Sequence, residues 1–238
     1  MLLPISTTVD LVNAGVSAYL AIRLARAMHQ DPASRMLRYF FYTYCALTVA
    51  YVFQTVPRVF SSQEVELLGV TFSIATLCFL VAAAFFSRVI LAYTLPRWAR
   101  PFFPIYLGLA GFAFVWSLLS PAAPIVDTAT GITNWNPDPG VGILASALFL
   151  LVLVPGAILF VRQAIQAKSN HIVRVRSITI GLGSAFLAAS AVMVFLATSE
   201  VLAVTSDFFS SGGMLVIFLG AAYHRPKQLP LITPPHAI

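Results

Sequence analysis

Charged side chains are scarce in this sequence. Only 9% of the 238 residues are Asp, Glu, Lys or Arg, whereas 59% are hydrophobic. Water-soluble domains keep a surface rich in charge, so this composition excludes a soluble domain of this size. A membrane-spanning helix needs about 20 consecutive apolar residues, and several such runs occur here between short polar segments. We therefore predict an all-α integral membrane protein that crosses the bilayer several times.

Lysine and histidine are also rare, and none of them falls inside a predicted span. A retinal chromophore needs a lysine in the last helix for its Schiff base, and a membrane-embedded haem b needs axial ligands, usually His, within the bilayer. We therefore predict no retinal, no haem and no other cofactor. Contacts with pigments or lipids follow no fixed motif and stay open. The residues concerned are Lys168, Lys227, His29, His171, His224 and His236.

The sequence also shows no sign of a disulfide bond or of a catalytic motif. The two cysteines, Cys45 and Cys78, both lie inside predicted spans, so we expect packing residues and no extracellular disulfide. We find no glycine-rich phosphate loop, no nucleophile beside a base, no cluster of metal ligands and no paired carboxylates at proton-relay spacing. The sequence therefore predicts a protein that is not an enzyme.

Seven apolar runs are candidate membrane spans. They cover residues 8–28, 37–60, 67–93, 103–119, 140–161, 178–198 and 201–223. The fourth run is short and the last two nearly abut, so six spans are the alternative. We predict a single domain, a bundle of seven transmembrane helices, followed by a short proline-rich cytoplasmic tail at 224–238. The N-terminal segment has no charged n-region, so we expect the first span to be retained.

Basic residues gather on one side of the predicted membrane. By the positive-inside rule, this distribution places the N-terminus outside and the C-terminus in the cytoplasm, in the cell (inner) membrane. The net charge of +6 then faces anionic lipid and not nucleic acid. The inner side carries Arg23, Arg26, Arg35, Arg38, Arg88, Arg97, Arg100, Arg162, Lys168, Arg174, Arg176, Arg225 and Lys227. The outer side carries Arg58 as its only cation, with Asp10, Glu64, Glu66, Asp127, Asp138 and Glu200.

A set of polar residues lies within the spans near this outer side. Asp207 is about a turn and a half inside the last span, and an ionised carboxylate near the bilayer centre costs about 2.5–3.5 kcal/mol. Spacings of three and four residues place the polar pairs of the first and second spans each on one helix face. The predicted cluster comprises Asp10, Asn13, Gln54, Arg58, Asp207 and Ser210.

This cluster has two interpretations. Because a buried carboxylate needs a partner, we predict that Asp207 pairs with Arg58, or accepts hydrogen bonds from hydroxyl groups and Asn13, around an outward-facing polar pocket. The alternative is a clamp between helices that binds no ligand.

The outer loop, residues 120–142, is rich in Pro, Gly, Asn and Asp, which predicts turns and no helix. Asn134, Asn136 and Asp138 stand at alternate positions, as at the start of a calcium loop. Pro139 displaces the required glycine and no bidentate Glu follows, so we predict no metal site. We expect Trp135 to anchor a turn-rich cap at the membrane interface.

Two spans carry distinctive stripes. In the sixth span Gly181, Ala185 and Ala189 repeat every four residues, with Ser184 and Ala188 beside them, which predicts a helix-packing face. The second span is rich in tyrosine, which we interpret as interfacial anchors and core filler, with a site for a flat ligand as the alternative. Its tyrosines are Tyr39, Tyr42, Tyr44 and Tyr51.

Several stretches together carry a family resemblance. The third span ends in "RVILAYTLPRWARP", the outer loop carries Thr133 and Asn134, and a basic loop opens the sixth span. In the last span Asp207 is followed by aromatic residues, by Gly212 and Gly213, and by the basic exit "YHRPKQL". With these features, nearly the whole chain resembles the seven-transmembrane N-terminal sensor region of bacterial histidine kinases.

The resemblance implies a role in signalling. In that family the helices are thought to sense an extracellular or membrane signal and to pass it to an attached cytoplasmic domain. This would make Asp207 and the outer loop signal-facing. Since only a short tail follows Tyr223 here, we expect any output to pass through a separate protein.

The sequence therefore predicts a non-enzymatic membrane protein that works through partners, as a sensor and signal-transducing module or as an accessory subunit of a larger membrane complex. The expected partner is another membrane protein or a separate cytoplasmic signalling protein. The alternative is a small-solute transporter with its site at the polar cluster. Transporters often show internal repeats and broken helices, but spans one to three share no motif with spans five to seven.

Overall fold

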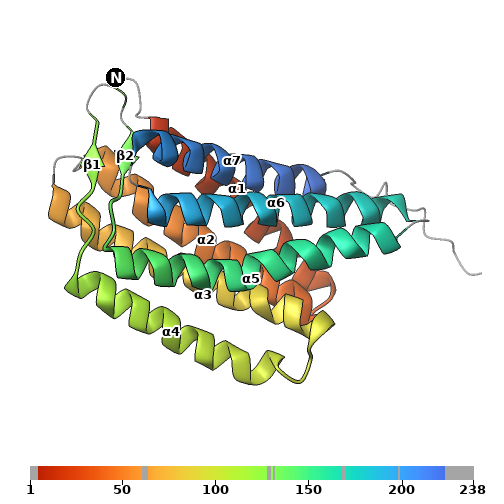
Figure 1. Cartoon of the computed structure of the whole chain (residues 1–238). Helices are drawn as coiled ribbons and strands as arrows, with labels where there is room; N and C mark the ends of the chain where they lie inside the picture. The colour runs from red at the N-terminus through yellow and green to blue at the C-terminus, as the bar shows by residue number, and fades with distance from the viewer. Residues whose placement is uncertain are drawn as a thin grey trace, which may run out of the picture.

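Nearly all of the chain that the structure describes is helical (Figure 1). The structure, a computed structural model, describes residues 5–60, 64–127, 130, 132–167, 170–197 and 199–222. The predicted tail at 224–238 lies outside the described residues. Within them the chain forms α1 (Ile5–Gln30), α2 (Arg35–Phe60), α3 (Val65–Thr94), α4 (Ala99–Leu119), β1 (Ile125–Val126), β2 (Thr133–Asn134), α5 (Pro139–Gln166), α6 (His171–Leu196) and α7 (Glu200–Ala222).

Six of these helices are long and apolar enough to cross a membrane: α1, α3, α4, α5, α6 and α7. The expectation of an all-α, multi-pass membrane protein is therefore confirmed. The helix α2 is long enough, with 26 residues, but it is less apolar than the other six. Its sequence "RYFFYTYCALTVAYVFQ" explains the difference, because tyrosine, threonine and glutamine replace aliphatic residues along it.

The helices α1, α2, α3, α5, α6 and α7 pack in a closed ring in which each contacts its two neighbours. The helix α4 stays outside the ring and packs mainly against α3, as its place at the edge of Figure 1 shows. The largest apolar core lies between α3, α4, α5 and α6, and includes the buried side chains of Phe72, Leu80 and Tyr106. A smaller core joins α1, α2 and α7 around Met214.

Between α4 and α5 the described residues of the outer loop form no helix, as predicted, and they include a two-stranded hairpin that was not predicted. Ile125 pairs with Asn134 and Val126 with Thr133, in antiparallel register. Strand β2 lies against α7, so the hairpin covers one end of the ring. This end carries the N-terminus of α1 in Figure 1.

The helices α6 and α7 approach each other closely at Gly183 and Gly213. A Cβ atom on Gly183 would lie 2.8 Å from the carbonyl oxygen of Gly213, and one on Gly213 would lie 2.9 Å from that of Gly183. Of the predicted packing row, Gly181 is buried against α5, Ala185 is exposed and Ala189 is partly buried. The small residues predicted beside the row, Ser184 and Ala188, are buried. At Gly183 the absence of a side chain lets the backbone of α6 come close to that of α7.

The Gly183 contact predicts a sharp difference between two glycine substitutions. We expect Gly183→Ala to lower the free energy of unfolding by about 1–3 kcal/mol, because the added methyl group has no room against α7. Gly111→Ala in α4, where a Cβ atom meets nothing within 4 Å, is expected to cause no loss. Equilibrium unfolding by SDS in mixed micelles measures both changes. Equal effects of the two substitutions would contradict the close approach.

Candidate functional site

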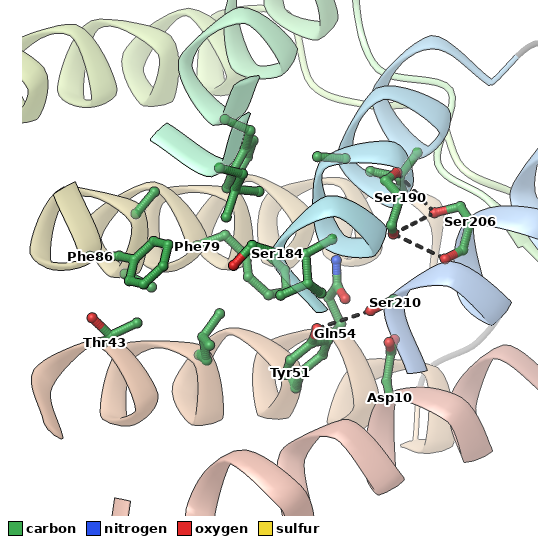
Figure 2. A pocket seen from close by; sticks show the side chains of 18 of the residues that line it. Asp10, Thr43, Tyr51, Gln54, Phe79, Phe86, Ser184, Ser190, Ser206 and Ser210 are labelled. Carbon is green, nitrogen blue, oxygen red and sulfur yellow. Dashed lines mark hydrogen bonds between the residues drawn. The ribbon is translucent and has the colours of Figure 1, made fainter. Parts of the chain in front are cut away.

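A cavity of about 130 Å³ lies inside the ring of helices. Its described walls come from α2, α3, α5, α6 and α7, with Asp10 contributed by α1 and Trp135 by the outer loop. Figure 2 shows Asp10 and Ser210 near one end of the cavity, and Thr43 and Phe86 near the other. The end next to the loop is polar and charged, whereas the rest is mostly apolar. The polar end carries Asp10, Gln54, Arg58, Ser206, Asp207 and Ser210.

A buried ion pair stands at the polar end. The Nη1 atom of Arg58 in α2 lies 2.8 Å from Oδ2 of Asp10 in α1, and the side chains are 4% and 6% exposed. A guanidinium removed from water needs a carboxylate and hydrogen bonds to compensate for its lost hydration. The pair therefore holds α1 and α2 together at this depth. Asp10 lies in the second turn of α1, and Arg58 lies in the last turn of α2.

Asp207 does not form the predicted ion pair with Arg58, since Arg58 binds Asp10. The carboxylate of Asp207 instead accepts a hydrogen bond of 2.6 Å from the hydroxyl of Ser6. The same Ser6 hydroxyl accepts a bond of 3.4 Å from the backbone N–H of Thr133 in β2. Ser6 thus links α1, α7 and the outer loop. The alternative predicted for Asp207, hydrogen bonding to a hydroxyl, is the one that the structure shows.

A second polar network joins three helices one turn deeper. Asn13 of α1 donates a bond of 3.0 Å from Nδ2 to the hydroxyl of Ser210 in α7. The Ser210 hydroxyl also lies 3.0 Å from that of Tyr51 in α2, the contact drawn in Figure 2. Of the predicted cluster, Gln54 and Ser210 line the cavity and Asn13 lies one contact away from it.

Trp135 lies inside the bundle and does not anchor the loop at the membrane interface, so that prediction is wrong. Its side chain is 3% exposed, stacks on Phe72 of α3 with ring centroids 4.7 Å apart, and lies 4.4 Å from Cζ of Arg58. A desolvated guanidinium over an indole ring is a favourable cation–π contact. The loop therefore places an aromatic ring over the ion pair and over the polar end of the cavity.

The other loop residues shape the chain around Trp135. The side chain of Asn134 accepts a bond from the N–H of Asn136, whose φ of 43° is in the left-handed region that Asn tolerates. Asp138 caps α5, accepting from the N–H groups of Gly140 and Val141 at 2.9 and 3.2 Å. These side chains thus act in turns and capping. Within the described residues no group of three or more His, Cys, Asp or Glu is placed to hold a metal ion.

The stripe that α2 presents to the cavity extends further than the sequence analysis recognised. Only Gln54 and Arg58 were assigned to this face, and the tyrosines were treated as anchors and filler. Its cavity residues follow spacings of three and four, the signature of one helix face: Phe40, Thr43, Tyr44, Leu47, Tyr51, Gln54 and Arg58. That spacing is readable from the sequence. On α6 and α7, Ser190 and Ser206 exchange hydrogen bonds of 3.0–3.2 Å beside the cavity.

Comparisons with known proteins give no information about the site, so only its geometry bears on its function. No protein-family model matches the chain, and searches of curated proteins and of solved structures find no match. Several polar groups of the cavity, among them Asp10, Arg58 and Asp207, are held by side chains of neighbouring helices, and most of the remaining surface is apolar.

The ion pair predicts strong coupling between two substitutions. We expect Arg58→Met to destabilise the protein by about 3–5 kcal/mol, because Asp10 is left buried and uncompensated. The double variant Arg58→Met/Asp10→Asn is expected to recover most of this loss, since no charge remains. SDS unfolding of the two single variants and the double variant gives the coupling energy. Additive effects would show that the pair does not stabilise the bundle.

The position of Trp135 predicts a contrast with a second tryptophan. Trp135→Ala is expected to cost about 3 kcal/mol, because it removes a buried ring that packs on Phe72 and Arg58. Trp98→Ala, at a side chain that is 60% exposed, is expected to change stability by less than about 0.5 kcal/mol. Thermal unfolding of both variants in the same detergent tests this. An equally small effect at Trp135 would mean that the loop does not pack into the bundle.

Proposed function

We propose that this protein is a membrane sensor module that binds a small molecule in its central cavity and signals through a partner protein. The observation that supports this most directly is the cavity itself, charged at one end and lined with aromatic and aliphatic side chains elsewhere. A concave, mainly apolar site with a few convergent polar groups is the usual form of a small-molecule site. The alternative of a clamp without ligand explains the ion pair but not the cavity beside it.

The position of the cavity supports a signalling role. Its walls belong to helices from both halves of the chain, so a ligand that fills it contacts α2 and α3 on one side and α6 and α7 on the other. A ligand shifts a conformational equilibrium only by binding one arrangement more tightly than another. Contact with both halves offers such a difference, because the distance between the halves sets the fit. In this proposal the helix ends opposite the loop carry the change to the partner.

The proposal includes seven membrane spans with the N-terminus outside. The helix α2 sits in the ring between α1 and α3 and matches α1 in length, at 26 residues each. Its polar stripe faces the cavity, so its lower apolarity is compatible with spanning. Arginines of α1, α3 and α5 lie toward one end of the bundle, which the positive-inside rule assigns to the cytoplasm. The cavity's charged end then faces outward, beneath the hairpin.

Ligand occupancy is testable with two matched substitutions in α6. Ala191 lines the cavity, whereas Ala185 is exposed on the outer face of the same helix. We expect the unmodified protein and Ala185→Phe, purified from membranes in mild detergent, to carry a bound small molecule in stoichiometric amount. Ala191→Phe should lose it, because the added ring occupies the cavity. Mass spectrometry of the extracted molecules and thermal unfolding of each variant provide the readouts.

The same preparations test the dependence on a partner. Proteins that co-purify in stoichiometric amount would support signalling or assembly through another chain. Uptake of the bound molecule into proteoliposomes that hold only this protein would instead assign it to transport. Equal small-molecule content in the two phenylalanine variants would contradict a ligand site in the cavity.

A further inference from the structure

We propose that the cavity selects a cation: a protonated amine carried on a single apolar ring, with its ammonium group beside Asp207 and Gln54. This inference rests on the proposed function, since it names the class of ligand that the cavity takes. Three features carry it, namely the charge balance at the polar end, an amide without a partner, and the size and lining of the apolar part.

The charges that line the cavity do not balance. Among the described residues that line it, the charged side chains are Asp10, Arg58 and Asp207. Arg58 and Asp10 compensate each other at 2.8 Å. Asp207 accepts a hydrogen bond from Ser6, but within the described part of the chain no cationic nitrogen lies within 4 Å of its carboxylate. A ligand with one positive charge would supply the missing partner, whereas an anionic ligand would add to the excess.

Gln54 supplies an independent sign that a polar ligand group belongs here. Its side chain is buried, with 7% exposure, and it lines the cavity in Figure 2. It makes no hydrogen bond to any other described residue. The amide lines the cavity, so its donor and acceptor groups are available to a polar group of a ligand. The carbonyl oxygen of Gln54 can accept from an ammonium group, which has three donors and needs acceptors on more than one side.

The rest of the cavity sets the size and character of the ligand body. An engineered cavity of about 150 Å³ lined by Leu, Ile and Phe binds benzene, so the whole cavity, with its polar end and about 130 Å³ in volume, has room for roughly one ring. Aromatic side chains surround this space, with Tyr51 and Phe79 in an edge-to-face contact at 4.9 Å. Aromatic faces attract both an apolar ring and a neighbouring cation. A ring that carries a short aminoalkyl arm fits both parts of the site.

Three probes of one shape and different charge test the inference on the full chain in lipid nanodiscs at pH 7. They are 2-phenylethylamine, which is a cation at this pH, 2-phenylethanol, which is neutral, and 3-phenylpropionate, which is an anion. We expect the amine to bind at least about tenfold more tightly than the alcohol, because a hydrogen bond between two charged groups is stronger than one to a hydroxyl. The anion should bind most weakly. Isothermal titration calorimetry measures all three affinities.

Substitutions then test whether the preference for the amine over the alcohol depends on Asp207. Asp207→Asn should lower the affinity for the amine to that for the alcohol and leave the alcohol's affinity unchanged. Glu200→Gln removes a carboxylate from the first turn of the same helix, outside the cavity, and should leave both unchanged. Ala191→Phe should abolish amine binding, which would locate it in the cavity and separate it from partitioning into lipid.

Any other result contradicts either the cationic ligand class or the position of its site. If the alcohol or the anion binds as tightly as the amine, or if none of the three binds, the cationic ligand class is wrong. The proposed ligand site is then tested independently by mass spectrometry of the two phenylalanine variants. A molecule that Ala185→Phe retains and Ala191→Phe loses would support it. If the amine still binds Ala191→Phe, its site is elsewhere and the inference is overturned. The probe series on the unmodified protein decides the question even if Asp207→Asn does not accumulate.

Discussion

The buried ion pair between Arg58 and Asp10 is the constraint on which the site depends. A guanidinium within the bundle must be compensated on every side from which water has been removed. Asp10 supplies the carboxylate from α1, at 2.8 Å, and Trp135 supplies an aromatic face from the outer loop, at 4.4 Å. Three segments distant in the sequence are thereby brought to one point. The loop is held over this end of the bundle in part by the contact of its tryptophan with Arg58.

This pairing also determines what remains available to a ligand. With Asp10 committed to Arg58, the second carboxylate, Asp207, is held by the Ser6 hydroxyl, which itself contacts the loop backbone. The cavity therefore has a polar end with fixed geometry and an apolar body that continues between the two halves of the chain. The helices α6 and α7, which form one wall of the cavity, pack closely at Gly183 and Gly213.

Much of this site could be predicted from the sequence, but not its pairing. Intramembrane polar residues are conspicuous against an apolar background, so Asp10, Arg58 and Asp207 were recognisable as a cluster near one depth. Which carboxylate reaches the guanidinium depends on the rotation of each helix and on its neighbours in the ring. The burial of Trp135 depends on the same arrangement, because the sequence around a tryptophan does not distinguish an anchor at the membrane interface from a ring buried in the bundle. The same rotation decides that Gly181 is buried in the bundle whereas Ala185 is exposed.

By itself the sequence determined that the chain is helical and crosses a membrane several times, and that its basic residues gather toward one end. Those properties follow from composition and from the lengths of apolar runs, which act locally along the chain. Only the tertiary structure decided that six helices form a ring with α4 outside, that Arg58 binds Asp10, and that a cavity remains beside Asp207. These outcomes depend on close packing between distant segments, where a rotation of one helix exchanges one partner for another.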